Sequence, residues 1–133
     1  MTTKTVLLAL ARTLRPRAYA PYSKFQVAAV IRGAGGKLYG GCNVENAAYP
    51  VGNCAEASAI AAMIADGETR IAEMLVMGPK GVLITPCGAC RQRIREFAAD
   101  SVKIHLADPK AVKKTVTLAK LLPLSFGPSH LGK

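Results

Sequence analysis

The spacing of hydrophobic and polar positions changes several times along the chain, and each change predicts a new element. Residues 3–14 are predicted to form a helix that ends before Arg15-Pro16, because a proline restricts the backbone of the residue preceding it. Residues 25–31 are apolar and rich in strand formers, and residues 37–43 alternate. A glycine-rich run at residues 33–36 separates them, so the two strands are expected to form a hairpin.

The second half of the chain alternates predicted strands with predicted helices. A helix over residues 54–65 stops at Asp66-Gly67, and another opens at Pro86 and runs to about residue 97. Strands are expected over residues 71–77, 82–85 and 102–106, with a short strand and a helical turn in the tail after Thr115. This order favours an α/β fold in which helices cover a mixed sheet.

Length and composition indicate a globular protein. The 133 residues fit a single domain over 1–133, which can bury a sizeable core without disulfides. No apolar run is long enough to cross a bilayer, and the apolar start lacks a signal-peptide cleavage pattern, so we expect a cytoplasmic protein. Thiols stay reduced there, and the four cysteines therefore indicate metal binding or catalysis rather than disulfides.

The chain is basic, with a formal net charge of +10 from 18 Lys+Arg and 8 Asp+Glu. Such a charge can attract nucleic acid. The basic residues, however, fall into separate clusters without the interleaved aromatic side chains on which bases stack. The charge is therefore better interpreted as solubilising than as a nucleic-acid-binding surface.

Three cysteines have the pattern of a zinc site. Cys87 and Cys90 are three residues apart at a helix start, and Cys54 opens the other long helix. A helix N-terminus favours the thiolate that a metal needs. Three protein ligands leave the fourth tetrahedral position to water, which is typical of a catalytic zinc. A redox pair and a structural zinc remain alternatives. Cys42 is expected in the core, and His105 and His130 in packing or on the surface.

Glu56 lies two residues after Cys54 in the first turn of the same helix. A carboxylate at this spacing can sit beside a metal without binding it, and hydrolysis by an activated water needs such a proton acceptor. A glutamate in the first turn can also have no role beyond a favourable interaction with the helix dipole. Together with Pro86 and the two downstream cysteines, the pattern matches the zinc deaminase signature with its non-ligand glutamate.

Two motifs, Cys54-Ala55-Glu56 and Pro86-Cys87-Gly88-Ala89-Cys90-Arg91-Gln92, resemble those of the small homotetrameric zinc-dependent cytidine deaminases. The resemblance extends from about Tyr22 to Phe126. It includes the early loop Tyr22-Ser23-Lys24-Phe25, the stretch Gly41-Cys42-Asn43-Val44-Glu45-Asn46-Ala47, Tyr49-Pro50 and the tail Leu121-Leu122-Pro123 with Phe126.

The resemblance implies a three-layer fold, with a mixed five-stranded sheet sandwiched by helices, and a role for each matching residue. Cys54, Cys87 and Cys90 would bind one Zn²⁺ per chain, and Glu56 would shuttle protons. The implied substrate contacts are the Ala55 backbone and Phe25 at the base, Asn43 and Glu45 at the ribose 3′-hydroxyl, and Tyr49 and Phe126 reaching sites of neighbouring subunits. A tetramer with shared active sites is therefore implied.

The chain departs from the family at Ala57, where the family usually has an arginine. Three thiolates on Zn²⁺ leave a net negative charge, which that arginine would reduce by hydrogen bonding to the sulfur atoms. Arg91, directly after Cys90, is the candidate to replace it. The alternative interpretation is that Arg91 is an ordinary surface or interface arginine.

The function expected from these residues is hydrolysis of cytidine and 2′-deoxycytidine to the uridine nucleosides and ammonia, a step of pyrimidine salvage. A carboxylate such as Glu45 accepts hydroxyl hydrogen bonds and repels a nearby phosphate, which favours free nucleosides over nucleotides. The alternatives are a deaminase of a modified nucleoside such as blasticidin S, and a nucleic-acid-binding or editing module.

Overall fold

The computed structural model describes residues 2–133 and has a five-stranded sheet at its centre, in the order β2-β1-β3-β4-β5. The strands are β1 (Ala28–Gly33), β2 (Leu38–Cys42), β3 (Ile71–Met77), β4 (Lys103–Ala107) and β5 (Val112–Thr117). Strands β3 and β4 are parallel, and the other neighbouring pairs are antiparallel. The sheet is therefore mixed.

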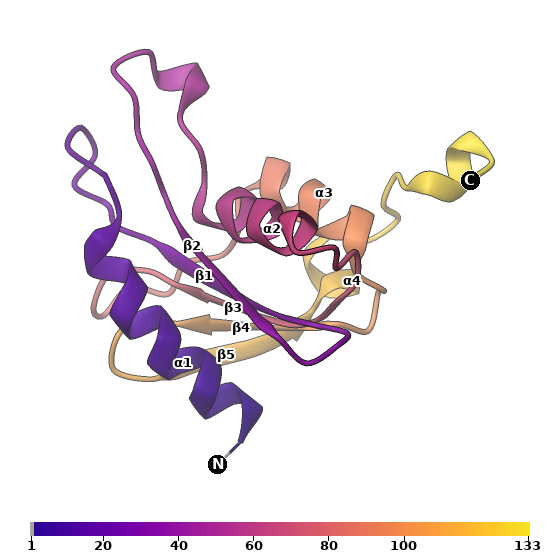
Figure 1. Ribbon diagram of the computed structural model, residues 1–133, viewed down its shortest axis with the longest axis horizontal. Helices are drawn as coiled ribbons and strands as arrows, with labels where there is room; N and C mark the ends of the chain where they lie inside the picture. The colour runs from indigo at the N-terminus through magenta and orange to yellow at the C-terminus, as the bar shows by residue number, and fades with distance from the viewer. Residues whose placement is uncertain (1) are drawn as a thin grey trace.

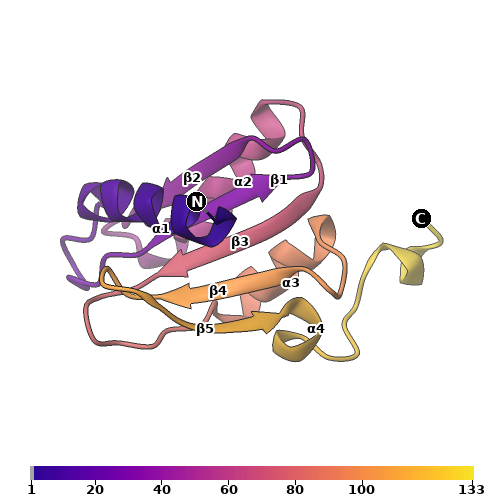
Figure 2. The same ribbon diagram turned by 90° about the horizontal axis from the view of Figure 1, so that it is seen from below.

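Helices cover both faces of the sheet, which confirms the expected α/β/α layers. Helix α1 (Thr3–Leu14) crosses one face, whereas α2 (Ala55–Ala65) and α3 (Gly88–Phe97) lie side by side on the other, with the short α4 (Leu118–Leu121) next to α3 (Figures 1 and 2). Three 3₁₀ turns complete the elements, at Arg15–Arg17, Tyr49–Val51 and Pro128–Leu131. None of the helices in residues 2–133 is both long and apolar enough to span a membrane.

The central strands are apolar on both sides because each side faces a helical layer. On β1, Ala29 and Ile31 pack into the cluster that includes Ala59 and Met63 of α2. The alternate residues of the same strand, Ala28 and Val30, join the cluster under α1. Strand residues point to opposite faces in turn, so a strand buried on both faces has a continuous apolar run.

The polar exception is a row of hydrogen-bonded side chains on the α1 side of the sheet. His105 Nε2 lies 2.5 Å from Glu73 Oε2, and His105 Nδ1 lies 2.8 Å from Thr115 Oγ1. Arg32 Nε donates to the other Glu73 oxygen at 3.1 Å. Burial by itself raises the pKa of Glu73, but its hydrogen bonds, that from His105 first, lower it overall. His105 is therefore a buried, paired residue that ties β4 to β3.

Most of the expected elements are confirmed, and one is wrong. The helix over residues 3–14 and the strand over 71–77 have the predicted bounds. Residues 82–85, expected as a strand, form none. Strand β3, which this segment follows in the chain, is already paired with β1 on one side and β4 on the other, so the segment cannot pair with the strand before it. It runs over the surface instead, with only Ile84 packed against the core.

Candidate active site

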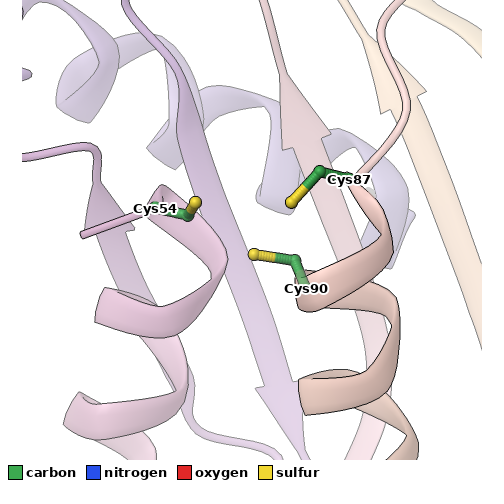
Figure 3. Close-up of side chains that lie close together, drawn as sticks. All are labelled: Cys54, Cys87 and Cys90. Carbon is green, nitrogen blue, oxygen red and sulfur yellow. The ribbon is translucent and has the colours of Figure 1, made fainter. Parts of the chain in front are cut away.

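The N-termini of α2 and α3 converge on one point above the sheet, and three thiols meet there. Cys54 is the N-cap residue of α2, Cys87 is the N-cap residue of α3, and Cys90 lies in the first turn of α3. Their sulfur atoms all lie within 4.8 Å of one another. Figure 3 shows the thiol of Cys54 pointing toward those of Cys87 and Cys90 across the gap between the two helices.

Close packing of α2 on the sheet helps to fix this position. A Cβ atom on Gly41 of β2 would lie 2.5 Å from the backbone nitrogen of Ala59 and 2.7 Å from Cβ of Ser58. Only glycine lets the strand and the helix approach so closely. Gly41 thus helps to position α2, the helix that Cys54 opens.

The three thiols fit a zinc ion. Zinc binds thiolate sulfur at about 2.3 Å in a tetrahedron, which places the sulfur atoms about 3.8 Å apart. That spacing falls within the 4.8 Å that encloses the three sulfur atoms, so small side-chain adjustments suffice. Three thiolates fill three of the four positions and leave one for water or substrate, as in a catalytic zinc site.

The thiols differ in environment before a metal binds. Hydrogen bonds from the backbone of Cys90 lower the pKa of Cys87, which lies exposed at the helix start. Burial raises the pKa of Cys54 and of Cys90. A metal binds the deprotonated forms, so zinc binding at neutral pH releases protons.

Glu56 is buried beside the thiols. Its exposed fraction is 5%, and burial raises its pKa above the ordinary value. Its negative charge acts to raise the pKa of each of the three cysteines, which shows how near it lies. Its carboxylate is nevertheless not part of the compact group of ligand atoms. This placement fits a proton carrier rather than a metal ligand.

The expectation for Arg91 is corrected by its hydrogen bonds. Arg91 donates to the backbone oxygens of Pro86 and Leu121 and to Thr85 Oγ1, so each guanidinium nitrogen is engaged away from the thiols. Arg93 Nη1 donates to Cys90 Sγ at 3.4 Å instead. Residues three apart share a helix face, whereas adjacent residues do not. This spacing is the signal that singles out Arg93, which the sequence analysis missed.

Comparison with known proteins matches residues 1–106 to the cytidine and deoxycytidylate deaminase zinc-binding region. The chain belongs to the cytidine deaminase family. A cytidine deaminase of Sporosarcina psychrophila is 40% identical over 125 residues, which cover 94% of this chain and 92% of the relative. The crystal structure of cytidine deaminase from Burkholderia pseudomallei has a TM-score of 0.87 at 38% identity and covers 95% of this chain and 100% of the other. That from Mycobacterium tuberculosis has a TM-score of 0.83 at 31% identity, covering 96% and 99%.

The loop between β2 and α2 projects beyond the sheet (Figure 1). With the loop after α1 it forms a hollow of about 260 Å³. Glu45 forms part of its lining, together with Tyr22, Ser23, Asn46, Tyr49 and Gly52. Glu45 Oε1 accepts the backbone N–H groups of Tyr22 and Ser23 at 3.0 and 3.1 Å, and Oε2 accepts the Ser23 hydroxyl. These hydrogen bonds, that from the Ser23 side chain first, lower the pKa of Glu45. It thus presents a carboxylate to this hollow.

Asn43 holds the segment before β1 through both ends of its amide. Its Oδ1 accepts the Val27 N–H at 2.9 Å, and its Nδ2 donates to the Phe25 carbonyl at 2.8 Å. These bonds explain why β1 begins at Ala28 rather than at residue 25. They also fix the backbone of Phe25, whose side chain is 39% exposed.

The remaining predicted contacts lie at the start of α2 and on exposed segments. Ala55 is the first residue of α2, and the backbone N–H groups of a first helical turn have no partner within the helix. Tyr49 is 74% exposed, with its ring centroid 5.8 Å from that of Tyr22. Phe126 is exposed on the C-terminal segment, which extends away from the sheet (Figures 1 and 2). Its ring stacks on His130, and its carbonyl accepts from Gln92.

Proposed function

We propose that this member of the family hydrolyses cytidine and 2′-deoxycytidine to uridine and 2′-deoxyuridine, with release of ammonia. The observation that carries the proposal is the buried Glu56 beside three thiols at two helix N-termini. This arrangement provides a zinc site and a proton carrier within one small volume, which is what hydrolytic removal of an amine requires.

In the proposed reaction, Cys54, Cys87 and Cys90 hold the zinc ion and Glu56 moves the protons. Zinc supplies a Lewis acid that makes water a nucleophile at neutral pH. Glu56 accepts the proton of the water that attacks C4 of the cytosine ring. It passes this proton to ring N3, takes the second proton from the hydroxyl that has added at C4, and gives it to the amine. The C4–N bond then breaks as the C4 carbonyl forms, and ammonia leaves. Burial of Glu56 supports this role, because it raises the pKa of the carboxyl and so favours the protonated form that donates to the amine.

The proposed substrate contacts lie in the loops after α1 and β2 and at the start of α2. Glu45 Oε2 has acceptor capacity beyond its bond to Ser23 and is proposed to accept the ribose 3′-hydroxyl. Asn43 is proposed to contact the same hydroxyl and to hold Phe25 in place for packing on the base. The backbone of Ala55, at the unpaired first turn of α2, is proposed to contact the pyrimidine ring.

Tyr49 and Phe126 are proposed to act on neighbouring subunits of a homotetramer with shared sites. Their exposure on projecting segments supports this, since neither packs into the core of its own chain. We also propose that the whole chain works as one domain in the cytoplasm, where the four thiols stay reduced.

An ultraviolet deamination assay with four substrates tests the proposal. Purified, zinc-loaded protein is given cytidine, 2′-deoxycytidine, cytidine monophosphate and blasticidin S. Turnover of both nucleosides with poor turnover of the monophosphate is expected, because Glu45 repels a phosphate beside the sugar. Turnover of blasticidin S without turnover of the two nucleosides would replace the proposal with that of a modified-nucleoside deaminase. Turnover of none of the four would contradict it.

A further inference from the structure

A groove lies on the surface between α2 and α3. It has a volume of about 440 Å³ and is lined by Ala57, Ile60 and Ala61 from α2 and by Gln92, Arg93, Glu96 and Phe97 from α3. Ala57, in the first turn of α2, contributes only a methyl group. The α2 side of the groove is therefore apolar, with only a short side chain at position 57. The positive charge in the groove comes from Arg93 of the facing helix.

Arg93 reaches the thiol cluster from the second turn of α3. Its Nη1 donates to Cys90 Sγ at 3.4 Å. Arg93 also lies near the start of α2, because it lines the same groove as Ala57. Arg93 itself is exposed, and its guanidinium therefore enters the groove without a large cost of desolvation.

We propose that Arg93 is a positioning residue for the zinc site, which balances the negative charge of the three thiolates from α3 and thereby takes over a task that Ala57 cannot perform. The proposal rests on the zinc-dependent function proposed above. The three negative charges of the thiolates exceed the two positive charges of Zn²⁺. Each thiolate also donates electron density to the metal, which makes it a weaker Lewis acid. A hydrogen bond to sulfur withdraws part of that density, and such partners outside the ligand set tune both affinity and activity.

The placement has a direct consequence for substitutions at the two facing positions. If the sulfur atoms need a cationic hydrogen-bond donor, that donor can come from either α2 or α3, because Ala57 and Arg93 line the same groove. Arg93→Gln removes the charge, Arg93→Lys keeps it without the planar guanidinium, and Ala57→Arg returns a guanidinium from the opposite wall. Arg70→Gln, at an exposed arginine just before β3, is the matched control.

The test uses two readouts on the full-length protein, of which one does not depend on activity. The first is the sulfur-to-metal charge-transfer absorption of the cobalt(II)-substituted protein. Arg93→Gln is expected to shift this band to lower energy, because a thiolate without its donor gives up an electron more readily. Arg93→Lys is expected to shift it less, and Ala57→Arg in the Arg93→Gln background is expected to move it back toward wild type.

The second readout is the turnover of the zinc protein. Arg93→Gln is expected to lower kcat about 10- to 100-fold with a smaller change in KM, and Arg70→Gln to leave both unchanged. Thermal denaturation and light scattering check that fold and assembly are kept. An unchanged cobalt spectrum in Arg93→Gln would overturn the proposal. This holds even if the activity of the variant fell, because altered assembly could cause such a loss. Absence of turnover in the wild type would instead count against the proposed function, while the cobalt spectra would still decide the role of Arg93.

Discussion

The sulfur atoms of Cys54 and Cys90 lie within 4.8 Å of each other, although the two cysteines belong to different helices with strand β3 between them in the chain. The packing of α2 and α3 on the sheet brings them together. Buried residues such as Ala59 and Met63 on α2 and Ile94 on α3 anchor the helices in the core. The site is thus built by the fold, and buried apolar residues hold both helices in place.

Removing one ligand therefore separates zinc binding from folding. Cys87→Ser is expected to lose most of its zinc and its activity, because a hydroxyl is a far poorer zinc ligand than a thiolate. The exposed position of Cys87 means that the substitution removes little packing, so the far-ultraviolet circular dichroism is expected to stay unchanged. Unfolding of this variant, or of the wild type after chelation, would point to a structural zinc.

Glu45 offers a test of sugar binding. Glu45→Gln keeps the size of the side chain but replaces the charged acceptor, and a hydrogen bond to a charged group is worth about 1.5–3 kcal/mol. We expect KM for cytidine to rise roughly 10- to 100-fold, as measured by initial rates. The control is Glu68→Gln, since Glu68 accepts backbone N–H groups of Gly35, Thr69 and Arg70 in a different loop. Equal KM values for the two variants would exclude Glu45 from the sugar site.

Asp108 is expected to give the protein a pH-dependent part of its stability. Its Oδ2 accepts the Gly81 N–H at 2.8 Å, and Oδ1 accepts those of Lys110 and Ala111. These bonds, with Gly81 first, lower its pKa from 3.8 to about 2. Because the folded pKa lies below the unfolded one, the contribution is complete above 3.8 and is lost as the pH falls toward about 2.

The measurement is thermal denaturation of Asp108→Asn against pH. The amide nitrogen cannot accept the N–H of Gly81, so this variant is expected to melt below the wild type at neutral pH. The difference is expected to shrink as the pH falls through the window above. Asp100→Asn, at an exposed aspartate, serves as the control. A difference that stays constant from neutral to acid pH would rule out this account of Asp108.

Sharing of sites between subunits predicts complementation. Phe126→Ala removes the ring proposed to close over a neighbour's base, whereas Glu56→Gln removes the proton carrier of its own site. Each variant alone is expected to be weak or inactive. Co-expressed, the two chains are expected to form mixed assemblies in which some sites have an intact Glu56 and a neighbour's Phe126, and so to recover activity. Activity no greater than the sum of the separate variants would contradict the sharing of Phe126.

Much of the fold was predictable because local rules and tertiary structure agree. The proline after Arg15 and the glycine after Asp66 mark the ends of α1 and α2, and the zinc motifs directed attention to the three cysteines that the structure brings together. Residues 82–85 were predicted wrongly because their apolar composition favours a strand, whereas strand pairing is decided by neighbours that lie far away in the chain.

Two side-chain contacts were not predicted from the sequence, for different reasons. The contact of Glu73 with His105 depends on the parallel register of β3 and β4, which sets Glu73 opposite Lys103, two residues before His105. The bond from Arg93 to Cys90 is set by local helical spacing, which favours Arg93 over Arg91 although Arg91 lies closer in sequence.

The most direct test of the central claim compares the wild type with Glu56→Gln for zinc content and cytidine turnover. Gln keeps the shape of the side chain and cannot carry the proton. Both proteins are expected to hold about one zinc ion per chain at the site of the three thiols. The variant is expected to lose at least about 10²- to 10⁴-fold in kcat, the usual contribution of a positioned acid or base. Near-normal turnover in a zinc-loaded Glu56→Gln protein would contradict the account.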